Sequence, residues 1–180
     1  MNNLRPYKDH RPVVGAGVYI DQGAHLIGDV VLNNDVSIWP MVVIRGDVNH
    51  IRIGARTNIQ DGSVLHVARP TTQNSAGHAL IIGEDVTVGH KAMLHGCTIG
   101  NLVLIGMGAI IMDGVIIEDN VIVGAGALVS PGKKLDSGFL YLGNPARKVR
   151  ALTIEEKESL IRSSLQYVKL KNEYLDELTV

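Results

Sequence analysis

A six-residue repeat of aliphatic side chains runs through most of the sequence and limits the fold more than any other feature. Three of its series, each in steps of six, are Leu26, Leu32, Ile38 and Ile44; Val30, Val36, Val42 and Val48; and Ile99, Ile105, Ile111, Ile117, Val123 and Val129. A period of six matches neither an α-helix nor the alternation of a hairpin strand. It predicts an all-β solenoid of triangular cross-section, in which three six-residue sides form one coil and the aliphatic side chains stack inward.

The composition suits many short strands joined by tight turns. Glycine occurs 20 times and aromatic residues make up 4% of the chain, while hydrophobic residues reach 46% and can supply a core. Glycine tolerates the dihedral angles of corners, and β-branched residues favour strands. The pattern resembles that of the hexapeptide-repeat proteins, and this resemblance implies a left-handed parallel β-helix. The handedness rests on the resemblance alone, because general chain rules favour right-handed crossovers.

Breaks in the repeat predict the domain organisation. We expect an N-terminal arm over residues 1–12, a β-helix domain over residues 13–146, and a connector with a C-terminal α-helix over residues 147–180. Within the β-helix domain, residues 68–78 are polar and lack the repeat. They predict a loop ejected from the solenoid.

The C-terminal segment has the features of a helix. Thr153 and Glu156 match a capping box. Apolar side chains at helical spacing lie on one side: Ile161, Leu165, Val168 and Leu175. We expect a helix from Thr153 to Leu178 that packs along the outside of the solenoid or on a neighbouring subunit. The acidic residues of its polar face argue against a membrane-surface role.

Charge and cysteine content exclude several classes of protein. The net charge of −1 favours neither nucleic acid nor a membrane surface as a partner. The longest apolar-rich run is too short to span a bilayer, which needs about 20 apolar residues. Cys97 is the one cysteine, and the first ten residues lack the apolar region of a signal peptide. We therefore expect a cytoplasmic protein.

The spacing of three histidines predicts a metal site between subunits. His66 and His95 are 29 positions apart, and without the eleven residues of the loop they would be 18 apart, which is one coil. They should therefore stack on one face. His90 precedes His95 by five residues, about 16 Å of extended chain, so it could not share a metal with His95 within one chain. By spacing alone, a ladder of hydrogen-bonded histidines explains the pair equally well.

Several stretches resemble the γ-class carbonic anhydrase-like family, in particular its YrdA-like branch. They are Ile44-Arg-Gly-Asp-Val48, Asn58-Ile-Gln-Asp61, Val64-Leu-His66, Val88-Gly-His90, Leu94-His-Gly-Cys-Thr98, Ile105-Gly-Met-Gly108 and Tyr141-Leu-Gly-Asn-Pro145. The similarity covers nearly the whole chain, including the arm at Leu4-Arg-Pro-Tyr7 and the C-terminal helix. The ordered set of motifs is far more specific than any single hexapeptide.

The resemblance implies a homotrimer in which His66 and His95 of one subunit and His90 of the next bind a metal ion. This ion would be Zn²⁺, with Fe²⁺ or Co²⁺ as alternatives. It also implies further site residues: Arg45 and Asp47 as a charged pair at the interface, Asp61 in their network, Gln60 bonded to the reacting water, Asn58 nearby, and Tyr141 approaching the site. Simpler structural roles remain open: an interface salt bridge for Arg45 and Asp47, corner positions for Asn58 and Asp61, and packing for Tyr141.

The implied function is hydration of CO₂ to bicarbonate by a metal-activated hydroxide. One departure from the family pattern lowers the expected rate. Family members with high activity have glutamates for proton transfer, whereas Val48 follows Asp47 here and the loop over residues 68–78 contains no acid. His78 could replace them as a proton carrier.

Two other functions fit the same residues. The first is metal-dependent hydrolysis of an acyl-CoA thioester, and the second is a structural or assembly role for the trimer with a metal that does no catalysis. A hexapeptide acyltransferase is disfavoured, because such enzymes use a catalytic histidine beside a pantetheine groove rather than three histidines.

Overall fold

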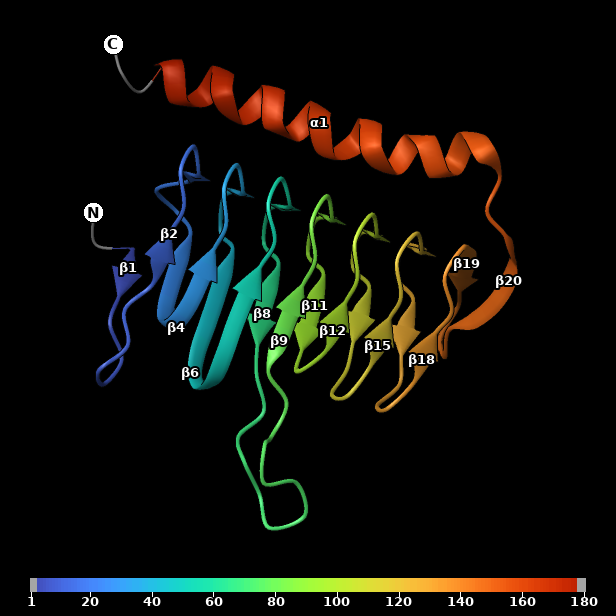
Figure 1. Cartoon of the computed structure of the whole chain (residues 1–180), viewed down its shortest axis with the longest axis horizontal. Helices are drawn as coiled ribbons and strands as arrows, with labels where there is room; N and C mark the ends of the chain where they lie inside the picture. The colour runs from blue at the N-terminus through green and yellow to red at the C-terminus, as the bar shows by residue number, and fades with distance from the viewer. Residues whose placement is uncertain (1–2, 178–180) are drawn as a thin grey trace.

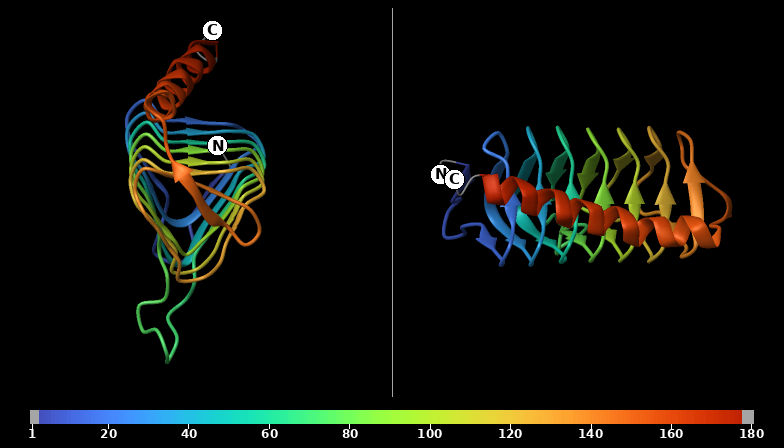
Figure 2. Two further views of the ribbon diagram at one scale, coloured as in Figure 1. Left: turned by 90° about the vertical axis from the view of Figure 1, so that its right-hand side faces the viewer. Right: turned by 90° about the horizontal axis from the view of Figure 1, so that it is seen from above.

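A computed structural model describes residues 3–177, and residues 1, 2 and 178–180 lie outside this range. The chain winds as a solenoid of short parallel strands, and a view along its axis shows the triangular outline (Figures 1 and 2). This is the left-handed parallel β-helix that the repeat and its resemblance predicted. The coils stack regularly because each strand pairs with the strand one coil away.

The three faces of the solenoid differ in their strands. The first face contains β3 (Tyr19–Ile20), β5 (Ser37–Ile38), β7 (Asn58–Ile59), β10 (Thr87–Val88), β13 (Leu104–Ile105), β16 (Ile122–Val123) and β19 (Phe139–Leu142), and β20 (Arg147–Ala151) pairs with β19 in antiparallel fashion. The second face contains β1 (Leu4–Arg5), the first halves of β4 (His25–Leu32) and β6 (Val43–Ile53), and then β8 (Val64–His66), β11 (Met93–His95), β14 (Ile110–Ile111) and β17 (Leu128–Val129). The third face contains β2 (Val13–Val14), the second halves of β4 and β6, and then β9 (Leu80–Ile82), β12 (Thr98–Ile99), β15 (Ile116–Ile117) and β18 (Lys134–Leu135).

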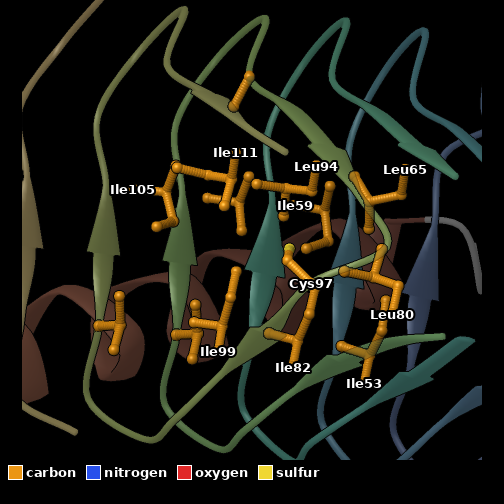
Figure 3. Close-up of a cluster of buried hydrophobic side chains, with 14 of the residues drawn as sticks. Ile53, Ile59, Leu65, Leu80, Ile82, Leu94, Cys97, Ile99, Ile105 and Ile111 are labelled. Atoms are coloured by element: carbon orange, nitrogen blue, oxygen red, sulfur yellow. The ribbon is translucent and has the colours of Figure 1, made fainter. Parts of the chain in front are cut away.

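The aliphatic residues of the repeat point inward and form one continuous core (Figure 3). On the second face, Leu65 pairs in register with Leu94, and Leu94 with Ile111. All three side chains are fully buried. Each such side chain contributes about 1.5–3 kcal/mol through burial, so the ladder holds neighbouring coils together.

Corners require left-handed backbone conformations at regular intervals. At the corner between the first and second faces, Gly62 has a φ of 70° and Lys91, one coil on, has a φ of 56°. Glycine adopts this region without strain, whereas a lysine there costs free energy that the surrounding ladder must offset. The frequent glycines of the sequence therefore reflect the corners.

The polar segment that breaks the repeat leaves the solenoid at the corner between the second and third faces (Figure 1). Ala68 and His78 form an antiparallel bridge at its base, with two backbone hydrogen bonds of 2.9 and 3.0 Å. The loop thus begins and ends at one point, so the coils on either side of it stack as if it were absent.

Helix α1 (Ile154–Glu177) runs back along the outside of the first face toward the N-terminal coils (Figures 1 and 2). The capping box is present, since the Glu156 N–H donates to Thr153 Oγ1 and the Thr153 N–H donates to Glu156. The predicted final residue, Leu178, lies outside the described residues. Within residues 3–177, no helix combines the length and the hydropathy that crossing a membrane requires.

The side of α1 that contacts the solenoid coincides only in part with the predicted one. Ile161 and Leu165 are 46% and 51% exposed, whereas Leu160, Ser164 and Lys171 are buried. The contact surface combines polar groups with an aromatic cluster of Tyr19, Trp39, Tyr167 and Tyr174. Of the four predicted apolar residues, Val168 and Leu175 are partly buried and Ile161 and Leu165 are exposed, because the contact side also uses polar and aromatic groups that an aliphatic stripe does not include.

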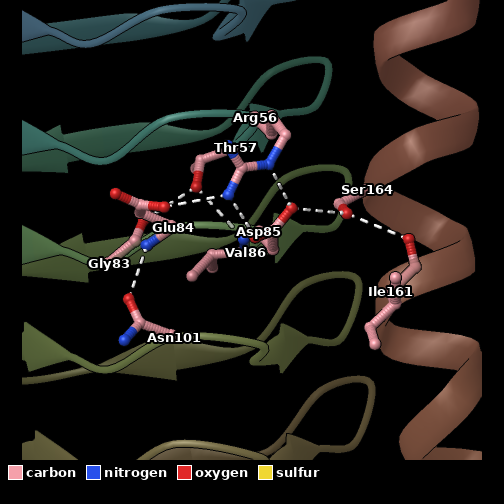
Figure 4. A network of polar contacts seen from close by, with 9 residues as sticks. All are labelled: Arg56, Thr57, Gly83, Glu84, Asp85, Val86, Asn101, Ile161 and Ser164. Carbon is pink, nitrogen blue, oxygen red and sulfur yellow. Dashed lines mark hydrogen bonds and ion pairs between the residues drawn. The ribbon is translucent and has the colours of Figure 1, made fainter.

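Two ion-pair networks anchor α1. Arg56 binds Asp85 through two nitrogens and also binds Glu84, while the Ser164 hydroxyl donates to Asp85 at 3.0 Å (Figure 4). Closer to the C-terminus, the Lys171 ammonium pairs with Asp35 at 2.9 Å.

Candidate metal site

Two of the three candidate histidines lie side by side on the outside of the second face. His66 ends β8 and His95 ends β11, and the strand register pairs them directly, in agreement with the spacing of one coil. Each follows an inward leucine, so the alternation of the strand turns both rings outward. His66 Nδ1 lies 3.0 Å from His95 Nε2.

Each of the three histidines has one ring nitrogen bound to an aspartate. His66 Nε2 lies 2.9 Å from Asp47, and His95 Nδ1 lies 2.6 Å from Asp113. His90, at the corner between the first and second faces, has its Nδ1 2.9 Å from Asp61. Carboxylate–histidine pairs of this kind orient the ring and fix its tautomer in metal sites.

The aspartates determine which nitrogens can bind a metal. An ionised carboxylate only accepts hydrogen bonds, so the nitrogen beside it carries the proton. In neutral rings, the lone pairs of His66 Nδ1 and His95 Nε2 then face each other across 3.0 Å. A hydrogen bond between them would need a second proton on one ring, whereas a cation between them needs none.

Electrostatics around His66 favour its neutral form. Burial lowers the pKa of His66, and this effect outweighs the opposing attraction of the Asp47 carboxylate. Burial would raise the pKa of Asp47, but its hydrogen bonds to His66 and Arg45 outweigh burial and hold that pKa below its ordinary value. A neutral imidazole beside an ionised aspartate is the form that ligates metals.

The two facing nitrogens are close enough to share an ion after a small adjustment. They lie 3.0 Å apart, whereas two nitrogens at about 2.1 Å from a tetrahedral Zn²⁺ would lie about 3.4 Å apart. His90 is half-exposed at its corner and is not part of this pair. Among residues 3–177, no three histidine, cysteine or acidic side chains of a single chain gather as a metal-binding group. A complete site would therefore need a ligand from outside this set.

Asn58 and Gln60 lie on the first face, close to the His90 corner. Both are buried, and Gln60 lines a groove of about 280 Å³ together with Thr87, Leu104, Met107 and Ile122. Gln60 Nε2 donates to Asn58 Oδ1 at 3.1 Å. Asp61, the next residue, holds His90, so Gln60 and His90 belong to the same region of the molecule.

One predicted residue does not join the site. Tyr141 lies in the core position of β19, in register with Val123, and is 4% exposed. Its hydroxyl accepts a hydrogen bond from the Asp136 N–H at 2.8 Å. Tyr141 therefore packs at the end of the core, since its place in the strand turns the ring inward and away from the histidines.

The sequence analysis missed one residue that contacts a candidate histidine. Asp113, which holds His95, lies 18 positions after it and so one coil further along the solenoid. The coil arithmetic that paired His66 with His95 could have found it. A Cβ at Gly96 would lie 2.3 Å from Asp113 Oδ1 and 2.7 Å from the His78 Cβ, so the approach of Asp113 to His95 requires glycine at this position.

Comparison with known proteins agrees with the fold and the motifs. A family model described as "Bacterial transferase hexapeptide (six repeats)" matches residues 11–46 and 96–131, and one described as "Hexapeptide repeat of succinyl-transferase" matches residues 79–111. The crystal structure of a hexapeptide transferase family protein from Anaplasma phagocytophilum is 39% identical, with a TM-score of 0.90 over 97% of this chain and 99% of that chain.

Two curated relatives match almost end to end. Protein YrdA of Escherichia coli is 62% identical over 97% of this chain and 95% of its own length. A carbonic anhydrase of Geobacillus kaustophilus is 42% identical over 97% of this chain and 92% of its own length. The chain therefore belongs to the γ-class carbonic anhydrase-like family of hexapeptide-repeat proteins.

Proposed function

We propose that this chain is a metal-dependent carbonic anhydrase that hydrates CO₂ to bicarbonate and works as a homotrimer. The observation that carries the proposal is the set of three histidines, each with one nitrogen beside an aspartate, of which His66 and His95 turn their other nitrogens toward each other. Relatives named as carbonic anhydrases support the reaction.

Three-fold assembly would complete the metal site. His66 and His95 point outward from the second face, and His90 points outward from the corner beside it. In a closed ring, the second face of one subunit meets that corner of the next, which brings a third nitrogen to the facing pair and forms equivalent sites at each interface. Outward apolar residues on the second face, namely Val64, Met93 and Ile110, support this contact, because isolated subunits would leave them in water.

Three neutral imidazoles suit Zn²⁺, with Fe²⁺ and Co²⁺ as alternatives. When bound, such an ion lowers the pKa of a water molecule and so supplies hydroxide near neutral pH. The residues of the chain orient this chemistry. Gln60 offers its carbonyl oxygen to a water in the groove, and Arg45 with Asp47 holds His66 in place.

Proton removal limits the proposed rate. Val48 follows Asp47, and the loop over residues 68–78 contains no carboxylate. His78 lies at the base of this loop, where its Nε2 is 3.1 Å from Asn74 Nδ2. Because His78 packs against Gly96, the residue that follows His95, it is the proton carrier of this proposal.

Stopped-flow measurement of CO₂ hydration tests the proposal, with protein of full metal occupancy and His90→Ala as the control. We expect turnover that the control lacks. Absence of turnover at full occupancy would exclude the enzyme. Saturable hydrolysis of an acyl-CoA thioester under the same conditions would then identify a thioesterase, and loss of thermal stability on chelation without any turnover would identify a structural metal.

A further inference from the structure

A row of hydrogen bonds between four side chains connects the groove to helix α1. Gln60 Nε2 donates to Asn58 Oδ1 at 3.1 Å, and Asn58 Nδ2 donates to Thr87 Oγ1 at 3.0 Å. Thr87 Oγ1 lies 2.9 Å from the Ser163 hydroxyl of α1. Asn58 and Thr87 are buried, so each bond is shielded from water.

A backbone carbonyl fixes which side chain donates and which accepts in this row. Asn58 Nδ2 also lies 3.4 Å from the Val86 carbonyl oxygen, which can only accept, so the amide nitrogen of Asn58 must be on that side. The Asn58 oxygen then faces Gln60, which must donate with its own nitrogen. As a result, the side-chain oxygen of Gln60, Oε1, is turned away from Asn58, and it has no protein partner among residues 3–177.

Helix α1 therefore packs on the first face and is also linked to Gln60 through the hydrogen bond between Ser163 and Thr87. We propose that Ser163 and Thr87 are positioning residues, which hold the Gln60 amide with its carbonyl oxygen toward the groove so that it accepts a hydrogen bond from the reacting water. This inference rests on the proposed function for the identity of that water, but the orientation of Gln60 can be measured without it.

Neighbouring serines allow a matched comparison. Ser163→Ala removes the last hydroxyl of this row of hydrogen bonds, whereas Ser164→Ala removes a hydrogen bond between α1 and Asp85 that lies outside the row. Thr87→Val leaves an Asn58 amide hydrogen unpaired, and Thr87→Ser keeps the hydroxyl. Two quantities are measured for each variant: the exchange rate of the side-chain amide protons of Asn58 and Gln60 by NMR, and kcat and KM for CO₂ hydration.

We expect Ser163→Ala and Thr87→Val to increase amide exchange and to lower kcat by about three- to ten-fold, the effect of one hydrogen bond, with little change in KM or metal content. Ser164→Ala and Thr87→Ser should match the unmodified protein. Wild-type exchange rates in both Ser163→Ala and Thr87→Val would overturn the inference, as would an equal effect of Ser164→Ala. If the unmodified protein shows no turnover, the proposed function fails, and amide exchange alone decides the role of Ser163 and Thr87.

Discussion

Aspartates beside the histidines decide the chemistry of the site at the level of single residues. Asp47, Asp113 and Asp61 each accept a hydrogen bond from one ring nitrogen, so the other nitrogen of each neutral ring carries the lone pair. Without these partners the rings could rotate or change tautomer, and a metal would have to pay the cost of ordering them. The arrangement thus prepares three nitrogens before any ion binds.

Removal of Asp113 tests this argument directly. Asp113→Ala deletes the acceptor at 2.6 Å that holds His95, so the apparent Kd for Zn²⁺ should rise by about 10- to 100-fold. Competition with a chromophoric chelator measures this affinity. Asp136→Ala, which deletes an exposed carboxylate paired with Lys148, is the control and should bind zinc normally. Equal affinity of the two variants would contradict an orienting role for Asp113.

The sequence could predict which residues lie side by side where the spacing equals one coil. His66 and His95 pair because they are one coil apart, and Asp113 follows the same rule. The inward direction of Tyr141 also follows from its register with Val123, which agrees with the packing role that the sequence analysis left open for this residue. Counting also places Thr87 beside Asn58, but the amide orientations of Asn58 and Gln60 depend in addition on the Val86 carbonyl and on Ser163 of α1, which no spacing reveals.

At the level of elements, α1 shows how a helix can dock without an aliphatic stripe. Lys171 is fully buried against the N-terminal coils, and its partner Asp35 is about half-exposed at a corner with a φ of 59°. Hydrophobic periodicity identifies Ile161 and Leu165, which remain exposed, and Val168 and Leu175, which are partly buried, but it gives no weight to a buried lysine that pairs with an aspartate. The capping box predicted where the helix begins, and the periodicity predicted only part of its contact side.

The Lys171–Asp35 pair predicts an asymmetry between two substitutions. Asp35→Asn retains a side chain that tolerates positive φ but leaves the ammonium buried without a counter-charge, so α1 should open more easily by about 1–3 kcal/mol. Lys171→Met removes the charge and keeps the apolar stem, so it should cost less than about 1 kcal/mol. Hydrogen exchange of the amides in the last three turns of α1 measures both. A larger effect of Lys171→Met would show that the ion pair itself stabilises the docked helix.

At the level of the whole molecule, stability is the sum of contacts between adjacent coils. The core ladder passes the loop without interruption, since Leu65 pairs with Leu94 across it. A solenoid of this kind depends on nearest neighbours, so an insertion at a corner affects it little. The same property made the triangular solenoid predictable from the repeat, whereas its handedness came from the resemblance.

Shortening the loop tests this independence. Ala68 and His78 form a hydrogen-bonded antiparallel pair, which a two-residue turn can close. Replacing residues 69–77 with Asn-Gly should change Tm by less than about 4 °C, because no core contact is lost. Differential scanning calorimetry measures the change. Aggregation or a much lower Tm would show that the loop contributes to folding.

Mixing of inactive subunits tests the proposed division of the metal site. Because His66→Ala and His90→Ala each remove a ligand, homotrimers of either variant should be inactive. In a mixed trimer, an interface between the second face of a His90→Ala subunit and the corner of a His66→Ala subunit retains all three histidines. Random co-assembly of equal amounts should therefore restore about a quarter of the sites, as measured by CO₂ hydration and bound zinc after refolding together. Mixing folded trimers without refolding is the control and should restore nothing, and failure of the co-assembled sample would place all ligands within one subunit.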